Sequence, residues 1–223
     1  MAEKAEKAEN SLVQRRREEI LAAAKSVFAR KGYRRTTIDE IAERLAVGKG
    51  TVYRYFADKK SLFLAVYESG LESLKKTMVS QIDTSDFPPE RTRVAVRTFI
   101  EFFYNNGELI EIMMHARSEF REEYIRSSQL LSRFYLGRIE ENLQSGIDMG
   151  VFRSMDVVHT AEAIGAMMQG ILDGYYVEQV PEISGMNSEK KKSLILNRAE
   201  AVAALILDGV MKTNESKIKK GGG

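Results

Sequence analysis

Residues 47–63, VGKGTVYRYFADKKSLF, are the most informative stretch of this chain. Up to Lys59 they include three basic side chains, two glycines and two tyrosines, an unusual composition for a core segment. On a helix with about 3.6 residues per turn, Val52 and Phe56 fall together on one side and are expected to face inward. The other side carries a cation, a hydroxyl, phenols and small backbone positions: Lys49, Gly50, Thr51, Arg54 and Tyr55, with Tyr53 at the edge. These groups suit the phosphates and base edges of a DNA major groove.

The residues around this stretch predict a helix-turn-helix. Apolar residues at three- and four-residue steps predict a helix from Leu12 to about Gly32. Thr37-Ile38-Asp39-Glu40 has the capping-box pattern and opens a helix of about two turns. After a turn of about three residues, the helix of residues 49–56 follows, and Asp58 caps a longer helix that runs to about Ile82.

The same segment resembles the N-terminal domain of tetracycline-repressor (TetR) family regulators over roughly residues 15–65. The resemblance is carried by Gly32-Tyr33-Arg34-Arg35-Thr36-Thr37-Ile38, Ile41-Ala42, Val47-Gly48-Lys49-Gly50-Thr51-Val52-Tyr53-Arg54-Tyr55-Phe56, Lys59 and Leu62. The chain departs from the family at Gly48, where a serine or a similar cap is usual. The resemblance implies base-edge contacts from Lys49, Gly50, Thr51 and Arg54, and phosphate contacts from Thr37, Tyr53, Tyr55 and Lys59.

Each of these residues also has a structural interpretation when it is taken singly. Tyr53 and Tyr55 suit half-buried packing, Arg54 and Lys59 suit solvated surface charge, and Thr37 suits a helix cap. The basic run Arg15–Arg17 is more often solvent-facing than bound to flanking phosphates. It is the joint pattern of these residues that favours DNA binding.

Composition and charge agree with this interpretation and exclude several other classes of protein. Residues 1–70 contain 15 Lys and Arg against 10 Asp and Glu, a net charge of +5, and the remainder contains 19 against 22, a net charge of −3. A basic head on a mildly acidic body is typical of polyanion binding. Without cysteine, the chain has no disulfide, thiol catalysis or cysteine-ligated metal, and its two distant histidines argue against a metal site. The charged start and the short apolar runs predict a cytoplasmic protein.

We therefore expect an all-α protein of about nine helices, with a three-helix helix-turn-helix domain and a larger helical domain for ligand binding and dimerisation. The expected divisions are a disordered or frayed extension at 1–11, the DNA-binding domain at 12–57, a connecting helix at 58–82, the ligand-binding and dimerisation domain at 83–213 and a disordered tail at 214–223. Downstream helices are expected near 89–106, 108–115, 117–149, 156–179 and 189–212. Between the last two, a break is expected at 181–187.

The larger domain offers a candidate pocket for an apolar or amphipathic effector. Methionine and aromatic side chains line adaptable apolar pockets, although each one singly is more often ordinary core. The candidates are Arg97, Phe99, Phe103, Met113, Met114, Arg117, Met167, Met168, Asp173 and Tyr175.

The last two helices are expected to form a homodimer interface, as the resemblance also implies. A stripe of small residues recurs in 156–179, and the helix of 189–212 is apolar on almost every side, more than one neighbouring helix usually covers. The candidate interface residues are Ala163, Ala166, Gly170, Gly174, Ala199 and Ala203.

The leading hypothesis is a ligand-responsive transcriptional regulator, a repressor that binds a near-palindromic operator as a dimer and needs no cofactor. A second hypothesis keeps the DNA binding without a small molecule, as in an architectural or protein-regulated DNA binder. A third is a helical enzyme with a vestigial head. The sequence shows no nucleophile–base pairing, phosphate loop or HExxH-like metal motif, so no catalytic residue is assigned.

Overall fold

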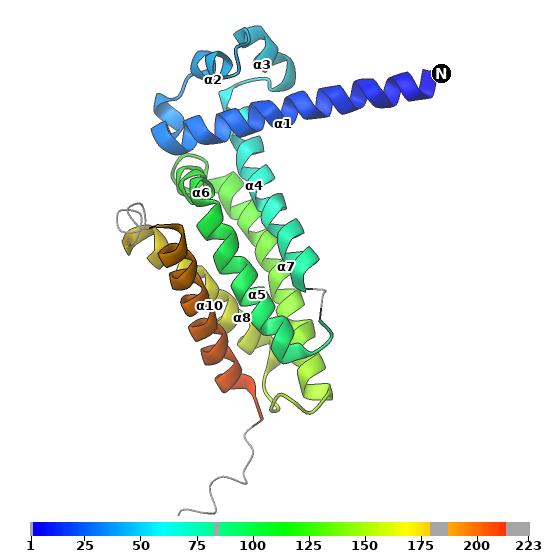
Figure 1. Ribbon diagram of the computed structural model, residues 1–223, viewed down its shortest axis with the longest axis vertical. Helices are drawn as coiled ribbons and strands as arrows, with labels where there is room; N and C mark the ends of the chain where they lie inside the picture. The colour runs from blue at the N-terminus through cyan, green and yellow to red at the C-terminus, as the bar shows by residue number, and fades with distance from the viewer. Residues whose placement is uncertain (1, 83–84, 179–186, 213–223) are drawn as a thin grey trace, which may run out of the picture. The chain divides into compact units, whose positions relative to one another are not determined.

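The computed structural model describes residues 2–82, 85–178 and 187–212, and in these ranges the chain is almost entirely helical (Figure 1). The helices are α1 Ala2–Arg35, α2 Ile38–Arg44, α3 Lys49–Tyr55, α4 Lys59–Ile82, α5 Pro88–Asn105, α6 Gly107–Glu119, α7 Arg121–Asp148, α8 Val157–Glu178 and α10 Ser188–Val210. Within the described ranges the one extended pairing is an isolated bridge between Phe152 and Met211. The all-α fold class is confirmed.

The chain divides into two compact units. One consists of Met1–Ser73 and Asn106–Ser128, and the other of Leu74–Asn105 and Gln129–Gly223. The first unit therefore joins the helix-turn-helix to α6 and to the start of α7, which the expected domain divisions keep apart. The expected tail at 214–223 lies outside the described residues, as does most of the expected break at 181–187.

The first helix differs from its expected bounds at both ends. Helix α1 begins at Ala2 and so includes residues 2–11, and at its other end it continues past the expected stop. Gly32 is the reason for the kink there, because its φ of 77° and ψ of 165° leave the helical region and suit only glycine. The hydroxyl of buried Thr36 donates to the Gly32 carbonyl at 2.8 Å and closes this end of α1.

The break between α6 and α7 lies at Phe120, four residues beyond the break expected near residue 116. No glycine or proline interrupts residues 108–119, so local sequence gives the helix no reason to stop earlier. Phe120 leaves the helix with φ −136° and ψ 58°, and its ring packs edge-on against Tyr33 at 4.7 Å between centroids. A contact with α1, distant in the sequence, thus accompanies the end of α6.

The core of the first unit lies between α1 and the helices that surround it. Helix α1 packs against α2 and α6, and α2 packs against α3. The fully buried large side chains include Ile20, Phe28, Ile41, Val52, Leu62 and Phe63. Burial of such side chains is worth about 1.5–3 kcal/mol each before the entropy cost of folding is counted. This core fixes α2 and α3 on α1 and on the start of α4.

The second unit is built around α5, α7, α8 and α10. Helix α10 packs along α5, where Val96, Ala203 and Ile206 form a buried cluster. A second cluster contains Leu143, Phe152, Ala161, Leu207 and Val210. At the end of α10 the chain pairs with the segment after α7, through Arg153 N–H to the Val210 carbonyl at 2.9 Å and Lys212 N–H to the Val151 carbonyl at 3.2 Å.

Candidate nucleic-acid interface

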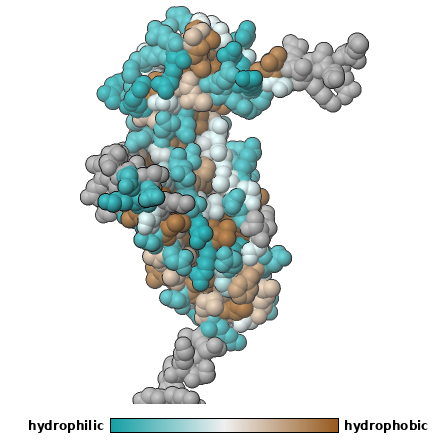
Figure 2. Space-filling view, viewed as in Figure 1, coloured by the Kyte–Doolittle hydropathy of each residue, from teal (hydrophilic) through white to brown (hydrophobic). Residues whose placement is uncertain are grey.

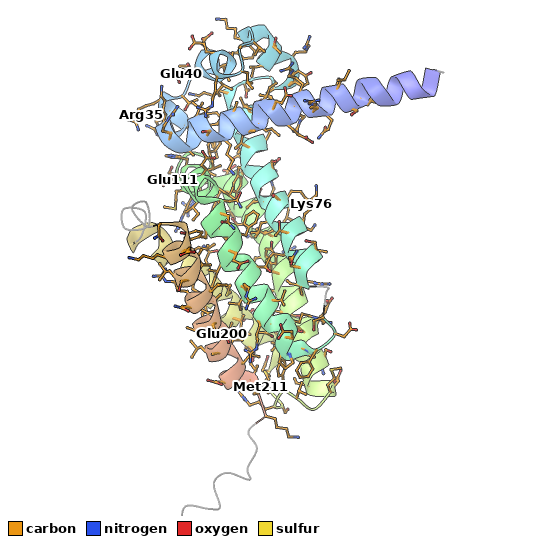
Figure 3. The ribbon with its side chains drawn as sticks, in the orientation of Figure 1. Arg35, Glu40, Lys76, Glu111, Glu200 and Met211 are labelled. Atoms are coloured by element: carbon orange, nitrogen blue, oxygen red, sulfur yellow. The ribbon has the colours of Figure 1, made fainter. Side chains whose placement is uncertain are left out.

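Helix α2 begins with the expected capping box. The Thr37 hydroxyl oxygen accepts from Glu40 N–H at 3.3 Å, and Thr37 N–H donates to Glu40 Oε2 at 3.1 Å. Lys31 also donates to the Glu40 carboxylate, and this bond, with those from Thr37, holds the pKa of Glu40 below its usual value. Figure 3 labels Glu40 at the start of α2. The box leaves the hydroxyl proton of exposed Thr37 available for another acceptor.

The turn between α2 and α3 is short and has a left-handed residue. Ala46 has a φ of 53°, and Val47 N–H returns to the Ala42 carbonyl at 3.0 Å. Gly48 is the residue before α3, and it contributes no side-chain cap. The departure from the family pattern therefore leaves the first turn of α3 capped by backbone alone, through Thr51 N–H to the Gly48 carbonyl at 2.9 Å.

Helix α3 has two different sides, as its sequence predicts. Val52 is 0% exposed and Phe56, the residue after the helix, is 5% exposed, so both belong to the core. The exposed residues of α3 are Lys49, Gly50, Tyr53 and Arg54, and Thr51 and Tyr55 are half-buried. A carbon added at Gly50 would meet no atom within 4 Å, so the backbone there is open to close approach. On the face drawn in Figure 2, hydrophilic residues dominate the surface at this end of the first unit.

Arg54 and Tyr55 lie against each other at the end of α3. The Arg54 guanidinium carbon is 5.5 Å from the centroid of the Tyr55 ring. A guanidinium over an aromatic face is held by a weak cation–π attraction, of about 0.5–1 kcal/mol at an exposed site. The Arg54 side chain is thus oriented without being covered.

Lys59 is engaged by the chain itself. Its ammonium donates to the Thr36 carbonyl at 3.0 Å and to the Arg34 carbonyl at 3.4 Å, and it lies 4.4 Å from the Tyr33 ring centroid. An ammonium has three N–H donors, so one remains for an external oxygen. Lys59 therefore fastens the start of α4 to the end of α1 whether or not it also touches DNA.

Two charged residues near α3, Asp39 and Arg17, were not assigned DNA contacts from the sequence. Lys49 Nζ lies 3.6 Å from Asp39 Oδ1 on α2. The Arg17 guanidinium lies 5.3 Å from the Phe56 ring centroid and so adjoins the end of the recognition helix. Arg15 and Arg16 both pair with Glu19 on α1. The basic run gave a signal in the sequence, whereas nothing in the spacing of Asp39 and Lys49 indicated their pairing.

The structure divides the candidate pocket residues between the two units. Met113, Met114 and Arg117 lie on α6 in the first unit, and the others belong to the second unit. Phe103 is buried, Phe99, Met113, Met114, Met167 and Met168 are half-buried, and Arg97 and Arg117 are exposed. Met167 and Met168 pack on the Val96–Ala203–Ile206 cluster. The side chains of Asp173 and Tyr175 lie outside the described residues.

The candidate interface residues separate into two groups. Ala163, Ala166 and Gly170 on α8 are exposed. Ala199 and Ala203 on α10 are only 3% and 1% exposed, because they form the face of α10 that packs into its own unit. Both side chains are therefore already covered within the single chain, and Ala201 and Leu205 occupy the exposed side of α10. The exposure of Gly174 is not among the features that the structure describes.

No group of three or more His, Asp or Glu side chains in residues 2–82, 85–178 and 187–212 is placed to hold a metal ion. No helix in that part of the chain has both the length and the apolar character needed to cross a bilayer.

Two family descriptions match the chain: "Bacterial regulatory proteins, tetR family" over residues 20–66 and "Tetracyclin repressor-like, C-terminal domain" over residues 85–175. The chain is 30% identical over 192 residues to the uncharacterized HTH-type transcriptional regulator YfiR of Bacillus subtilis, covering 79% of this chain and 89% of YfiR. It is 25% identical over 178 residues to the HTH-type transcriptional repressor AcnR of Corynebacterium diphtheriae, covering 74% of this chain and 82% of AcnR. Among solved structures, the regulator FadR of Bacillus subtilis in complex with stearoyl-CoA has a similar fold, with a TM-score of 0.67 at 19% identity over 86% of this chain and 98% of that one.

These similarities agree with the geometry of the first unit, in which α2 and α3 form a helix-turn-helix with an exposed polar recognition side. One family match covers that motif and the other covers most of the helices that follow. The chain therefore belongs to the tetR family of bacterial regulatory proteins, which are DNA-binding helix-turn-helix transcriptional regulators rather than enzymes.

Proposed function

We propose that this regulator is a repressor that binds a near-palindromic operator as a homodimer and is released by a small apolar or amphipathic effector. The observation that carries the proposal is the division of α3 into a buried side, Val52 with Phe56, and an exposed side that includes Lys49 and Arg54. A buried side fixes the helix on its unit, and an exposed cationic side is what a major groove requires.

The polar groups on and around α3 suggest which residues contact base edges and which contact phosphates. Lys49, Gly50, Thr51 and Arg54 are proposed to meet base edges, with the Arg54 fork suited to guanine O6 and N7. Thr37, Tyr53, Tyr55 and Lys59 are proposed to meet phosphates, because hydroxyl, phenol and ammonium groups all donate to phosphate oxygen. Thr37 and Lys59 each keep a donor beyond those that hold α1, α2 and α4 together.

A homodimer explains the exposed sides of α8 and α10. Small residues at Ala163, Ala166 and Gly170 allow a second helix to approach α8 closely, and Leu205 on α10 is 64% exposed in the single chain. Two recognition helices must reach successive major grooves, about 34 Å apart, so a symmetric pair suits a palindromic site.

An effector and a repressor role are supported by the relatives. FadR, a fold relative, was solved with stearoyl-CoA, an amphipathic molecule, and AcnR is a transcriptional repressor. The half-buried methionines Met167 and Met168 lie beside a small apolar cluster and suit an adaptable apolar lining. Release would follow from a higher affinity of the effector for a form that binds DNA poorly. A DNA binder without a small-molecule ligand stays the alternative.

In vitro selection tests the DNA-binding part of the proposal. Purified full-length protein is incubated with a library of random duplexes, and the bound duplexes are sequenced. Fluorescence anisotropy then measures the affinity of the protein for the enriched sequences. We expect two related half-sites, and we expect Arg54→Ala to lose about 1–3 kcal/mol of operator affinity and to relax one base position. No enriched sequence, or an Arg54→Ala variant with unchanged base preference, would contradict the proposed readout.

Effector release is tested on the selected operator with stearoyl-CoA as the first probe and with fractionated cell extract as the second. A concentration-dependent loss of anisotropy supports a small-molecule switch. Normal operator affinity with no release by either probe favours the alternative without a ligand.

A further inference from the structure

The ion pair between Lys49 and Asp39 joins the two helices of the helix-turn-helix at the proposed DNA surface. Lys49 is the first residue of α3, and Asp39 lies in the first turn of α2. Lys49 Nζ and Asp39 Oδ1 are 3.6 Å apart, and their side chains are 64% and 62% exposed. The carboxylate therefore lies beside a lysine proposed to read a base, on the same open surface.

The other acidic groups of α2 are placed differently. Glu40 is bound by Lys31 and by the backbone of Thr37, so its charge is held within the first unit. Glu43 is exposed and lies about one turn further along α2 than Asp39. Of the acidic side chains of α2, all of which are described, Asp39 is the one paired with α3.

The energetic consequence differs between non-specific and specific DNA. Non-specific binding comes almost entirely from cations that replace counterions on phosphates. A lysine held by a carboxylate contributes less to this term, and the carboxylate itself is repelled by nearby phosphates. On a cognate site the ammonium can donate to acceptors on a base edge, such as guanine O6 and N7. These hydrogen bonds compensate for the loss of its ion pair with the carboxylate.

We propose that Asp39 is a specificity-determining residue that acts through Lys49, by weakening binding to non-cognate duplexes more than binding to the operator. This inference rests on the proposed base contact of Lys49. Asp39 competes with the DNA for the Lys49 ammonium. Only a sequence with a suitable base-edge acceptor draws the lysine away from Asp39.

The experiment compares Asp39→Asn with Glu43→Gln in the full-length protein. Both variants remove one exposed negative charge from α2. For each, anisotropy gives the Kd for the selected operator and for a random-sequence duplex over a range of salt concentrations, and thermal unfolding confirms a folded protein. Since exposed ion pairs are worth about 0.2–1 kcal/mol, we expect Asp39→Asn to tighten random-duplex binding about 1.5- to 5-fold, with a smaller effect on the operator. Glu43→Gln is expected to shift both affinities alike and to leave their ratio unchanged.

Lys49→Ala and the double variant Asp39→Asn/Lys49→Ala separate this inference from the contact on which it rests. Lys49→Ala should weaken operator binding, and in its background Asp39→Asn should no longer change the specificity ratio. An unchanged operator affinity in Lys49→Ala overturns both the contact and the inference. A weakened Lys49→Ala with an unchanged ratio in Asp39→Asn overturns the inference alone. If Asp39→Asn alters the preferred base even in the Lys49→Ala background, Asp39 reads the base itself and action through Lys49 is excluded.

Discussion

At residue 146 the structure has room for a hydrogen atom and for no side chain. Gly146 is buried on α7, and a carbon added there would lie 2.0 Å from the ring of Phe152. Phe152 belongs to the core of the second unit, so its ring has little freedom to move aside. The close approach lets the chain turn back on itself after α7, with Val151 and Phe152 N–H both donating to the Gly146 carbonyl.

Two glycines of α7 are expected to respond differently to alanine. Gly146→Ala is expected to lower the free energy of unfolding by about 1–3 kcal/mol, because an overpacked core must shift ring or backbone. Gly137→Ala is the control, since an added carbon there meets nothing within 4 Å. Alanine at that position is expected to raise stability by up to about 1 kcal/mol, the usual gain over glycine in a helix. Urea unfolding measures both, and equal shifts in the two variants would refute the role of the Phe152 contact.

At the scale of elements, the corner between α6 and α7 is fastened to the helix-turn-helix within the first unit. The rings of Tyr33 and Phe63 lie 4.7 and 5.3 Å from that of Phe120, measured between centroids. Two residues close to Phe120 in the sequence also form ion pairs: Glu119 with Arg34 at 2.8 Å and Glu123 with Lys60 at 2.7 Å. The exposed ion pairs add little stability themselves, so the buried aromatic contact is expected to dominate.

Phe120→Ala is therefore expected to cost about 3–5 kcal/mol of unfolding free energy, as is usual when a buried phenylalanine is truncated. Phe87→Ala is the matched control, because Phe87 is 52% exposed and should change stability by less than about 0.5 kcal/mol. Differential scanning calorimetry of both variants checks the prediction. A melting temperature that falls no further for Phe120→Ala than for Phe87→Ala would show that the cluster does not hold the corner.

Helix α10 is apolar on two opposite sides, and only one of them is covered within the single chain. Its inner side supplies Ala199, Ala203 and Ile206 to the second unit, and Arg93 of α5 lies 3.7 Å from Glu200 of α10, which Figure 3 labels. Its outer side keeps Ala201 and Leu205 exposed in the single chain. A second copy of the chain is the proposed cover for that outer side.

Leu205→Glu is expected to dissociate the proposed dimer, because the interface would have to bury two unpaired carboxylates. Leu130→Glu is the control, since Leu130 on α7 is 65% exposed, almost the same as Leu205, and lies outside the proposed interface. Sedimentation velocity measures the mass, and anisotropy measures the operator affinity, which should fall with the dimer. A dimeric Leu205→Glu variant, or dissociation by Leu130→Glu as well, would place the interface elsewhere.

Local sequence signals are enough to predict the helical class and the helix-turn-helix. The signals for these are local: the Thr37–Glu40 box, the turn before α3, and the inward side formed by Val52 and Phe56 all lie within about twenty consecutive residues. Because caps and helix periodicity act over three or four residues, neighbouring positions are enough to reveal them.

Which partners these elements meet depends instead on long-range packing. Helix α6 ends just before Phe120, whose ring contacts rings on α1 and α4, and α10 buries Ala199 and Ala203 rather than Leu205 because of the helix that lies against it. The Asp39–Lys49 ion pair likewise links α2 to α3. The hydrogen bonds of Lys59 to two carbonyls link α4 to the end of α1 and the residue after it. Such contacts depend on how helices pack in space, and an apolar or charged residue carries no local mark of the one it will touch.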